Sequence, residues 1–299
     1  PQPYATYVRT LDQMCVLPSH AFDGDATKVN DSDYFKKPGF ASSGAYVVSE
    51  INDDNIVFTA RDDYYRGTPS VKKIIMKTIG SGSTSDIALE NDEISYMRVT
   101  TADQLEKYKK ASDEYTLYEL SEARLNYLQI NPASNLSDDE RKAIFLALDA
   151  QEIIDAAYGT DELAQPANSL MTPDQSFYDK DCKGYSQDIE TAKKLAESSG
   201  LTGKTINYKF NSDRANMEAV ATVVQQQLEK IGVKVNVQGA DSTTFFKSFF
   251  YMWYGSGEKD TSWDLASNGW DSERGTDLGQ SLSYFNSSFG YSDEIKTLA

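Results

Sequence analysis

The segment from residue 205 to residue 239 constrains the fold more than any other part of the sequence. "TINYKFN" predicts a strand, and the helix after it places Val220, Val224 and Leu228 on one side before Gly232 ends it. "VKVNVQG" then predicts a second strand. A strand, a long helix and a strand form a βαβ unit, which is normally right-handed with parallel strands. The chain is therefore expected to contain an α/β domain.

Further strands and helices are expected before and after this unit. "AYVVSEI" and "NIVFTAR" predict a hairpin around the "NDD" turn, and "VKKIIMKTI" a third strand. "SDIALENDEISYMRV" predicts a short helix and then a strand, and "TLYEL" and "WDLASNGW" are strand-like. "SDDERKAIFLAL" and "DAQEIIDAAYG" begin with capping patterns at Ser137 and Asp149, and "SQDIETAKKLAESSG" is a capped helix that ends at Gly200.

These elements predict an α/β fold with a mixed sheet that is flanked by helices. We expect the strand after Gly44 and the strand "VKVNVQ" to belong to one sheet. Residues 1–43 read as a short helix followed by a loop.

The charge balance argues against one large class of partners. The chain holds 46 Asp and Glu against 29 Lys and Arg, a formal net charge of -17. Nucleic acids are bound largely by clustered Lys and Arg, so no nucleic-acid partner is expected. Long uncharged apolar runs are absent from the sequence, so we expect no membrane span. Aromatic residues make up 12% of the chain, with 19 tyrosines, which is typical of surfaces that bind ligands by ring faces.

Side chains for catalysis and metal binding are scarce. His20 is the single histidine, which disfavours Ser-His-Asp, Cys-His and His-zinc chemistry. Cys15 and Cys182 lie far apart without CxxC spacing, and the sequence leaves open whether they pair. We therefore expect no catalytic residue, no metal and no cofactor.

The sequence is expected to be a segment of a longer protein. It opens at Pro1 without an initiator Met and stops inside "YSDEIKTLA", which reads as a helix. It shows no signal segment, so we expect that targeting segments have been removed.

Six phrases in a fixed order resemble one protein family. The stretch from Ser43 to Ile79 resembles a Gly-Pro-Tyr hinge strand with its following hairpin and strand, with Ala45 in place of the usual proline. "ALENDEIS", "DDERKAIFLALDAQEII", "YSQDIETAKKLAESSGLTG", "QQQLEKIGVKVNVQ" and the strand ending in "NGW" follow at similar spacing. The chain thus resembles family 5 of the extracellular solute-binding proteins, the peptide, dipeptide and nickel receptors of ABC importers.

This resemblance implies a type II periplasmic-binding-protein lobe. Residues 44–299 would form a nearly complete second lobe, and residues 1–43 would belong to or lead from the first lobe. Gly44 and Tyr46 would lie at the hinge, where glycine suits a backbone that changes its angles.

The implied function is capture of extracellular peptides for an ABC importer by closure of two lobes, without catalysis. The implied partners are a peptide or other small solute and the membrane permease subunits, and the protein would be a monomer. It would lie at the extracellular face of the cell membrane, held by a lipid anchor, or in the periplasm. Because an isolated lobe carries half a cleft, this chain alone is expected to bind peptide weakly or not at all.

The resemblance also implies a ligand site around "NGWDSE". Peptide-binding members commonly place an acid three residues after this tryptophan, where it takes the ammonium of the peptide. That position is Glu273, three residues after Trp270, although the family usually has Asp there. Asp271 and Asp277 are the alternative acids, and Gly269 and Asn268 complete the expected ligand-binding set.

Two other functions stay open at this point. A member of the same family would bind an oligosaccharide or a nickel chelate instead. A carbohydrate-active hydrolase would pair Glu273 with Asp264 or Asp271, since such enzymes need two carboxylates roughly 5 to 10 Å apart across a sugar.

Overall fold

The fold is taken from a computed structural model, which describes residues 16–29, 32–79, 83–122, 124–173, 175, 178–214, 216–249 and 260–271. Only the backbone is described for Phe249, Trp270 and Asp271. The chain forms two compact units, whose described parts run from Val16 to Arg98 and from Val99 to Asp271.

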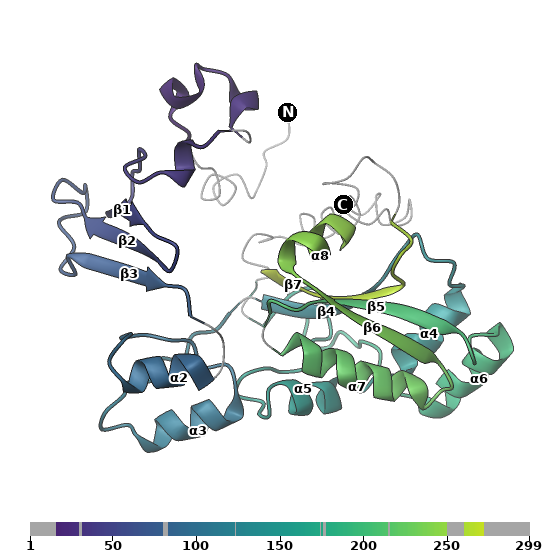
Figure 1. The fold of residues 1–299 in the computed structure, drawn as a ribbon. Coiled ribbons are helices and arrows are strands. Elements are labelled where there is room, and N and C mark those ends of the chain that lie inside the picture. Colours follow the sequence, from purple (N-terminus) through teal and green to yellow (C-terminus); the bar gives the residue numbers. More distant parts are fainter. Residues whose placement is uncertain are drawn as a thin grey trace. The chain divides into compact units, whose positions relative to one another are not determined.

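The smaller unit is built on a three-stranded antiparallel sheet (Figure 1). Its strands pair in the order β1-β2-β3, and β1 and β2 form the expected hairpin. Side chains on all five residues of β3 are exposed. The elements of this unit are η1 (Ser19–Phe22), η2 (Ala26–Lys28), η3 (Tyr34–Lys36), β1 (Tyr46–Ile51), β2 (Asn55–Ala60), β3 (Lys73–Lys77) and α2 (Ser83–Glu90).

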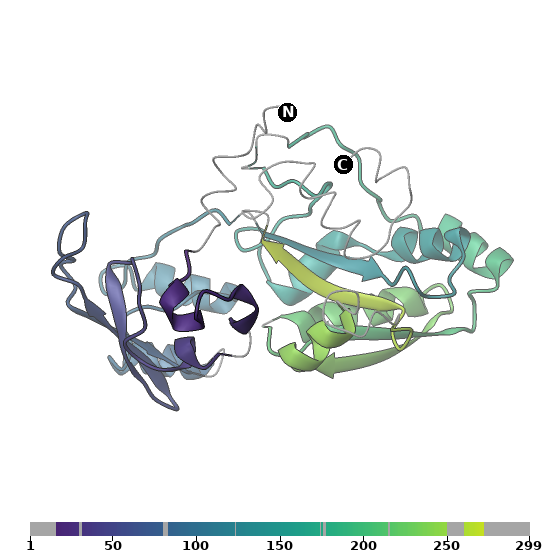
Figure 2. The same ribbon diagram turned by 90° about the horizontal axis from the view of Figure 1, so that it is seen from above.

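The larger unit holds a mixed four-stranded sheet in the order β4-β7-β5-β6. β4 pairs antiparallel with β7, whereas β5 runs parallel to both β7 and β6. Figure 2 shows the yellow β7 beside the teal β4. The elements are α3 (Ala102–Lys110), β4 (Arg124–Ile130), α4 (Asp138–Ala147), α5 (Ala150–Ala157), α6 (Ile189–Ser199), β5 (Thr205–Asn211), α7 (Met217–Glu229), β6 (Lys234–Ala240), α8 (Ser242–Phe249) and β7 (Leu265–Asp271).

The two faces of this sheet carry different cores. α5 and α7 lie on one side of it and α8 on the other (Figure 1). The main core joins helices α4 to α7 to side chains such as Ile130, Ile206 and Leu265. A smaller cluster on the α8 side consists of Phe245, Trp263 and Ala266. The alternation of side chains along β7 therefore sends Leu265 into one core and Ala266 into the other.

The helix starts and the helix end that were predicted from capping residues are confirmed. Ser137 and Glu140 form a reciprocal capping box at the start of α4. Asp149 accepts hydrogen bonds from the second and third residues of α5. Gly200 adopts the left-handed conformation that ends α6. The predicted βαβ unit is present, with β5 and β6 parallel across α7.

Two expectations are wrong. The strand after Gly44 and the strand "VKVNVQ" belong to different sheets, because β1 pairs within its own hairpin and β6 pairs with β5. Residues 94–99, at the end of "SDIALENDEISYMRV", and residues 116–120, "TLYEL", are expected as strands and are irregular. Part of the helix-and-loop expectation for residues 1–43 falls on residues 1–15, which lie outside the described residues; from Val16 on, the described residues of this segment include three short 3-10 helices. Pairing between strands far apart in the sequence leaves no local signal, which explains the first error.

Candidate functional site

The expected ligand-binding residues Asn268, Gly269, Trp270 and Asp271 close strand β7. They pair in antiparallel register with the first residues of β4: Asn268 with Tyr127, Gly269 with Asn126, Trp270 with Leu125 and Asp271 with Arg124. The fold thus brings one contiguous phrase of the sequence against a second strand. The side chains of Trp270 and Asp271 lie outside the described part, and so do Glu273 and Asp277.

Gly269 makes room for two polar side chains of β4. A Cβ atom at this position would lie 2.6 Å from Nη2 of Arg124 and 2.7 Å from Oδ1 of Asn126. Asn126 is held in place because its Nδ2 donates to the hydroxyl of Tyr158 at 2.8 Å. One side of Gly269 is therefore covered by Arg124 and Asn126.

Asn268 and Gln129 are buried amides on the face that carries α8. Asn268 is 2% exposed and Gln129 is 4% exposed. Asn268 Nδ2 donates to the hydroxyl of Tyr127 at 3.4 Å. Within the described part of the chain, Oδ1 of Asn268 and both amide atoms of Gln129 have no hydrogen-bond partner. Gln129 is not among the residues expected from the sequence, although a glutamine inside the apolar phrase "NYLQI" is a visible signal.

The opposite face of β7 is closed by a neutral hydrogen bond. The hydroxyl of Tyr208 on β5 hydrogen-bonds with that of Ser267, and both side chains are buried. Burial raises the pKa of Tyr208 well above its usual range, so this phenol stays protonated. Ser267 is therefore fixed to the main core, whereas its neighbour Asn268 faces the other way.

Lys209 connects three elements beside this strand. Its Nζ donates to Ser248 Oγ of α8 at 2.8 Å and to Ser262 Oγ, in the segment before β7, at 2.7 Å. Asp260 accepts from Ser248 Oγ and from the Ser262 N–H. Burial acts to raise the pKa of the Asp260 carboxyl, but the hydrogen bonds from Ser248 and Ser262 outweigh it and hold the pKa below its usual value. This group ties α8 and the start of β7 to β5.

Asp264, a candidate for a hydrolase carboxylate, is engaged with the backbone. Its Oδ2 accepts from the N–H of Asn207 at 2.9 Å. It lies just before β7, whereas Asp271 is the last residue of that strand. One oxygen of Asp264 thus has a structural role.

The expected hinge residues lie in the smaller unit, where Gly44 precedes β1 and Tyr46 is its first residue. The N–H of Gly44 donates to Ser42 Oγ at 3.2 Å, and a Cβ there would meet only ordinary contacts. The hydroxyl of Tyr46 donates to the carbonyl of Val71 at 3.0 Å. The conformation at Gly44 does not by itself require glycine, and bending at this point stays a prediction.

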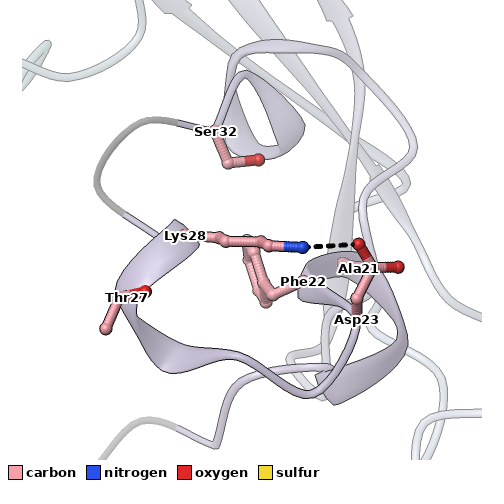
Figure 3. A pocket seen from close by; sticks show the side chains of 6 residues that line it. All are labelled: Ala21, Phe22, Asp23, Thr27, Lys28 and Ser32. Carbon is pink, nitrogen blue, oxygen red and sulfur yellow. Dashed lines mark hydrogen bonds and ion pairs between the residues drawn. The ribbon is translucent and has the colours of Figure 1, made fainter.

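A shallow hollow of about 400 Å³ lies in the smaller unit. It is lined by Ala21, Phe22, Asp23, Thr27, Lys28 and Ser32 (Figure 3). Lys28 Nζ pairs with Asp23 Oδ2 at 2.8 Å, so the two charges in the hollow offset each other.

Neither a metal-binding cluster nor a membrane-spanning helix is found among the described residues. Across those residues, no group of three His, Cys, Asp or Glu side chains is placed to hold a metal ion. None of the helices that the structure describes is long and apolar enough to cross a bilayer. Cys182 Sγ lies 3.5 Å from the carbonyl oxygen of Asn168. Cys15 lies outside the described part, so whether the two cysteines pair stays open.

Comparison with known proteins gives the family. The sequence model of the family "Bacterial extracellular solute-binding proteins, family 5 Middle" matches residues 1–293 of this chain. The chain belongs to this family. Members of family 5 are binding proteins of the extracellular space or the periplasm, and the resemblance inferred from the six phrases is confirmed.

Individual members of family 5 agree with this result. The oligopeptide-binding protein AppA of Bacillus subtilis is 25% identical over 251 residues, which cover 78% of this chain and 45% of AppA. The nickel-binding periplasmic protein of Escherichia coli is 24% identical over 211 residues, or 64% of this chain and 39% of that protein. The chain spans about half the length of the curated relatives it matches.

A solved structure confirms the fold class. The ABC transporter substrate binding protein CtaP of Listeria monocytogenes matches with a TM-score of 0.76 and 27% identity, covering 100% of this chain and 60% of CtaP. The structural neighbours in family 5 are type II periplasmic binding proteins, as expected for the α/β fold with helices flanking its sheet.

Proposed function

We propose that the protein is the substrate-binding component of an ABC importer and captures extracellular peptides. The observation that carries this proposal is the family match over residues 1–293. The similarity to an oligopeptide-binding protein over 78% of this chain favours peptides as the cargo. Burial of the peptide would come from closure of two lobes, with Gly44 and Tyr46 at the hinge and residues 44–299 forming most of the second lobe.

The proposed ligand site lies at the end of β7. Glu273 would take the α-ammonium of the peptide, with Trp270, Asp271, Gly269 and Asn268 beside it. An anionic partner is needed because a charge that is buried without a partner is costly. No catalytic step is part of this function. The engagement of Asp264 with the backbone supports binding rather than hydrolysis.

The proposed setting follows from the cargo. A receptor that delivers peptides to an importer docks on its permease subunits, and it works as a monomer outside the membrane. Attachment to the extracellular face through a lipid anchor and release into the periplasm are the two forms that this proposal allows.

A nickel chelate is the second candidate cargo. The similarity to the nickel-binding periplasmic protein over 64% of this chain favours it. The larger coverage by the oligopeptide-binding relative supports peptides as the first candidate. An oligosaccharide is the third candidate, on the aromatic content of the chain alone.

A thermal-shift screen of the full-length protein against mixed peptides, oligosaccharides and nickel chelates tests the proposal. We expect peptides to raise the midpoint of unfolding and to be recovered unchanged afterwards. A rise with nickel chelates or oligosaccharides and none with peptides would replace the cargo. Recovery of cleaved ligand would contradict a purely binding function.

A further inference from the structure

Two buried amides on the α8 side of the sheet have polar atoms without partners and lie next to each other. Tyr127 pairs with Asn268 and Gln129 pairs with Ala266, so Gln129 and Asn268 are diagonal neighbours on one face of the β4–β7 ladder. Both side chains are more than nine-tenths buried. Oδ1 of Asn268 and both polar atoms of Gln129 are unpartnered within the described part of the chain.

Such atoms are unusual in a folded protein. Buried polar side chains are nearly always hydrogen-bonded, because an unpaired one has lost its water without replacement. The surroundings of Gln129 and Asn268 on this face include apolar side chains. Ala266, the strand partner of Gln129, belongs to the apolar cluster of Phe245 and Trp263 on this face. An occupant that pairs with the two amides would remove the cost.

The unused bonding capacity defines the occupant. Gln129 offers a donor and an acceptor, and Asn268 offers one further acceptor, since its Nδ2 donates to Tyr127. No charge belongs to this pair, so a charged ligand group would be buried without compensation. A neutral group with both a donor and an acceptor fits.

We infer that Gln129 and Asn268 bind the main-chain amides of an extended peptide. An extended residue presents its N–H and C=O to the same side, as paired strand residues do when they exchange two hydrogen bonds. The amide of Gln129 takes both groups of one ligand residue, and Oδ1 of Asn268 accepts a neighbouring donor. This inference rests on the proposed peptide cargo and adds a recognition site that is independent of the ligand's charge and side chains.

Gln129 and Asn268 are buried, so a peptide can reach them only if the side chains that bury them move. Phe245 and Phe246 of α8 pack in the cluster on the same face, and the hydrogen bond from Lys209 to Ser248 holds α8 to the sheet. Peptide binding at Gln129 is thereby coupled to displacement of apolar side chains on this face.

Calorimetry with a series of ester-substituted peptides tests the inference on the full-length protein. Each peptide carries one ester in place of one amide and therefore lacks one N–H. In the wild type, we expect two ester positions to weaken binding about tenfold each, one that removes the N–H donating to Gln129 and one that removes the N–H donating to Asn268. In Gln129→Met, the all-amide peptide should bind about tenfold more weakly, and the ester at the position that faces Gln129 should cost nothing more. The unliganded variant should unfold no earlier than the wild type, because it loses an unpaired amide.

Gln225→Met is the matched control. Gln225 Nε2 donates to the carbonyl of Val235 at 2.8 Å from α7, on the other side of the sheet. This variant should be less stable and keep both the affinity and the ester profile of the wild type. Asn268→Leu is the second variant, and it should weaken the all-amide peptide if Oδ1 accepts from it.

The outcomes separate this inference from the proposed function. Wild-type affinity in both Gln129→Met and Asn268→Leu would overturn the inference and leave peptide capture intact. An ester profile that is the same in Gln129→Met and the wild type would also overturn it. A wild type that binds no peptide of the series would overturn the proposed function and the inference with it.

Discussion

At the scale of single residues, Gly269 carries a sharp prediction. Alanine in a strand is favoured over glycine by about 0.5 to 1 kcal/mol, but displacing packed side chains costs about 1 to 3 kcal/mol. The new Cβ would lie 2.6 Å from Nη2 of Arg124 and 2.7 Å from Oδ1 of Asn126, so both side-chain ends must move. Moving Asn126 gives up its hydrogen bond to Tyr158, so we expect the displacement cost to exceed the gain. Gly269→Ala should lower the free energy of unfolding by about 1 kcal/mol in urea titrations. In an Arg124→Ala background the loss should shrink; an unchanged loss would place the strain elsewhere.

Glu140 gives a prediction on pH. Burial acts to raise the pKa of Glu140, but hydrogen bonds from Lys204 and Ser137 outweigh it, so the pKa lies below its usual value of 4.5. The folded pKa is thus lower than the unfolded one, and the stabilisation is complete above pH 4.5 and declines as the pH falls below it.

Urea unfolding of Glu140→Gln checks this sign. The variant should lose about 1 to 2 kcal/mol at neutral pH, since glutamine lacks the charge that pairs with Lys204. The difference from the wild type should shrink at about pH 3.5. Glu197→Gln, at an exposed position of α6, is the control and should change stability by less than about 0.5 kcal/mol at either pH. A difference that grows towards acid pH would contradict the assigned direction.

Glu273 belongs to the proposed site, although it lies outside the described residues. A charge-assisted hydrogen bond to a peptide ammonium is worth about 1.5 to 3 kcal/mol. In the full-length protein, Glu273→Gln should therefore weaken binding of free-amine peptides by roughly ten- to a hundredfold. N-acetylated peptides should bind poorly to the wild type and be little affected by the change. Equal affinities of variant and wild type for a free-amine peptide would pass the role to Asp271 or Asp277.

At the scale of elements, Gln227 joins two helices. Its fully buried side chain accepts from the N–H of Asp149 and donates to the carbonyl of Asp149 and to Glu152. Gln227→Leu would leave the N–H at the start of α5 unpaired, at a cost of about 2 kcal/mol in unfolding free energy. Gln226→Leu, one residue away and exposed, should cost less than about 0.5 kcal/mol. Equal losses in the two variants would remove the bridge as the cause.

The elements also show what the sequence can predict. The capping box at Ser137 and the glycine stop at Gly200 are written in a few adjacent residues, and both are present. The strand pairing of β1 differs from the prediction because partners in a sheet are chosen across long separations, which periodicity does not report.

Some residues of the candidate site were predicted from the sequence, and others became apparent only from the strand pairing. The phrase "NGWDSE" indicates the end of β7 from the sequence alone, through resemblance to a family rather than through physical pattern. Gln129 belongs to none of the family phrases, and its proximity to Asn268 comes from the strand register, which only the folded strands reveal. The covering of Gly269 by Arg124 is likewise a property of the pairing.

At the scale of the whole molecule, the chain matches the family along almost its whole length but is much shorter than the family members it resembles. The family match covers residues 1–293, yet the chain spans about half the length of its curated relatives. Peptide capture by closure of two lobes is therefore a property we propose for the full-length protein. The division between compact units lies at Arg98 and Val99, and the proposed lobe boundary at residue 44 stays a separate prediction.

Calorimetric titration of a free-amine oligopeptide into the full-length protein, beside the same titration into residues 1–299 alone, tests peptide capture most directly. We predict saturable binding to the full-length protein, and weak or no binding to residues 1–299, because closure of two lobes is what buries the ligand. Absence of binding to the full-length protein across oligopeptides of several lengths would contradict peptide capture. Micromolar binding to residues 1–299 alone would contradict the requirement for two lobes.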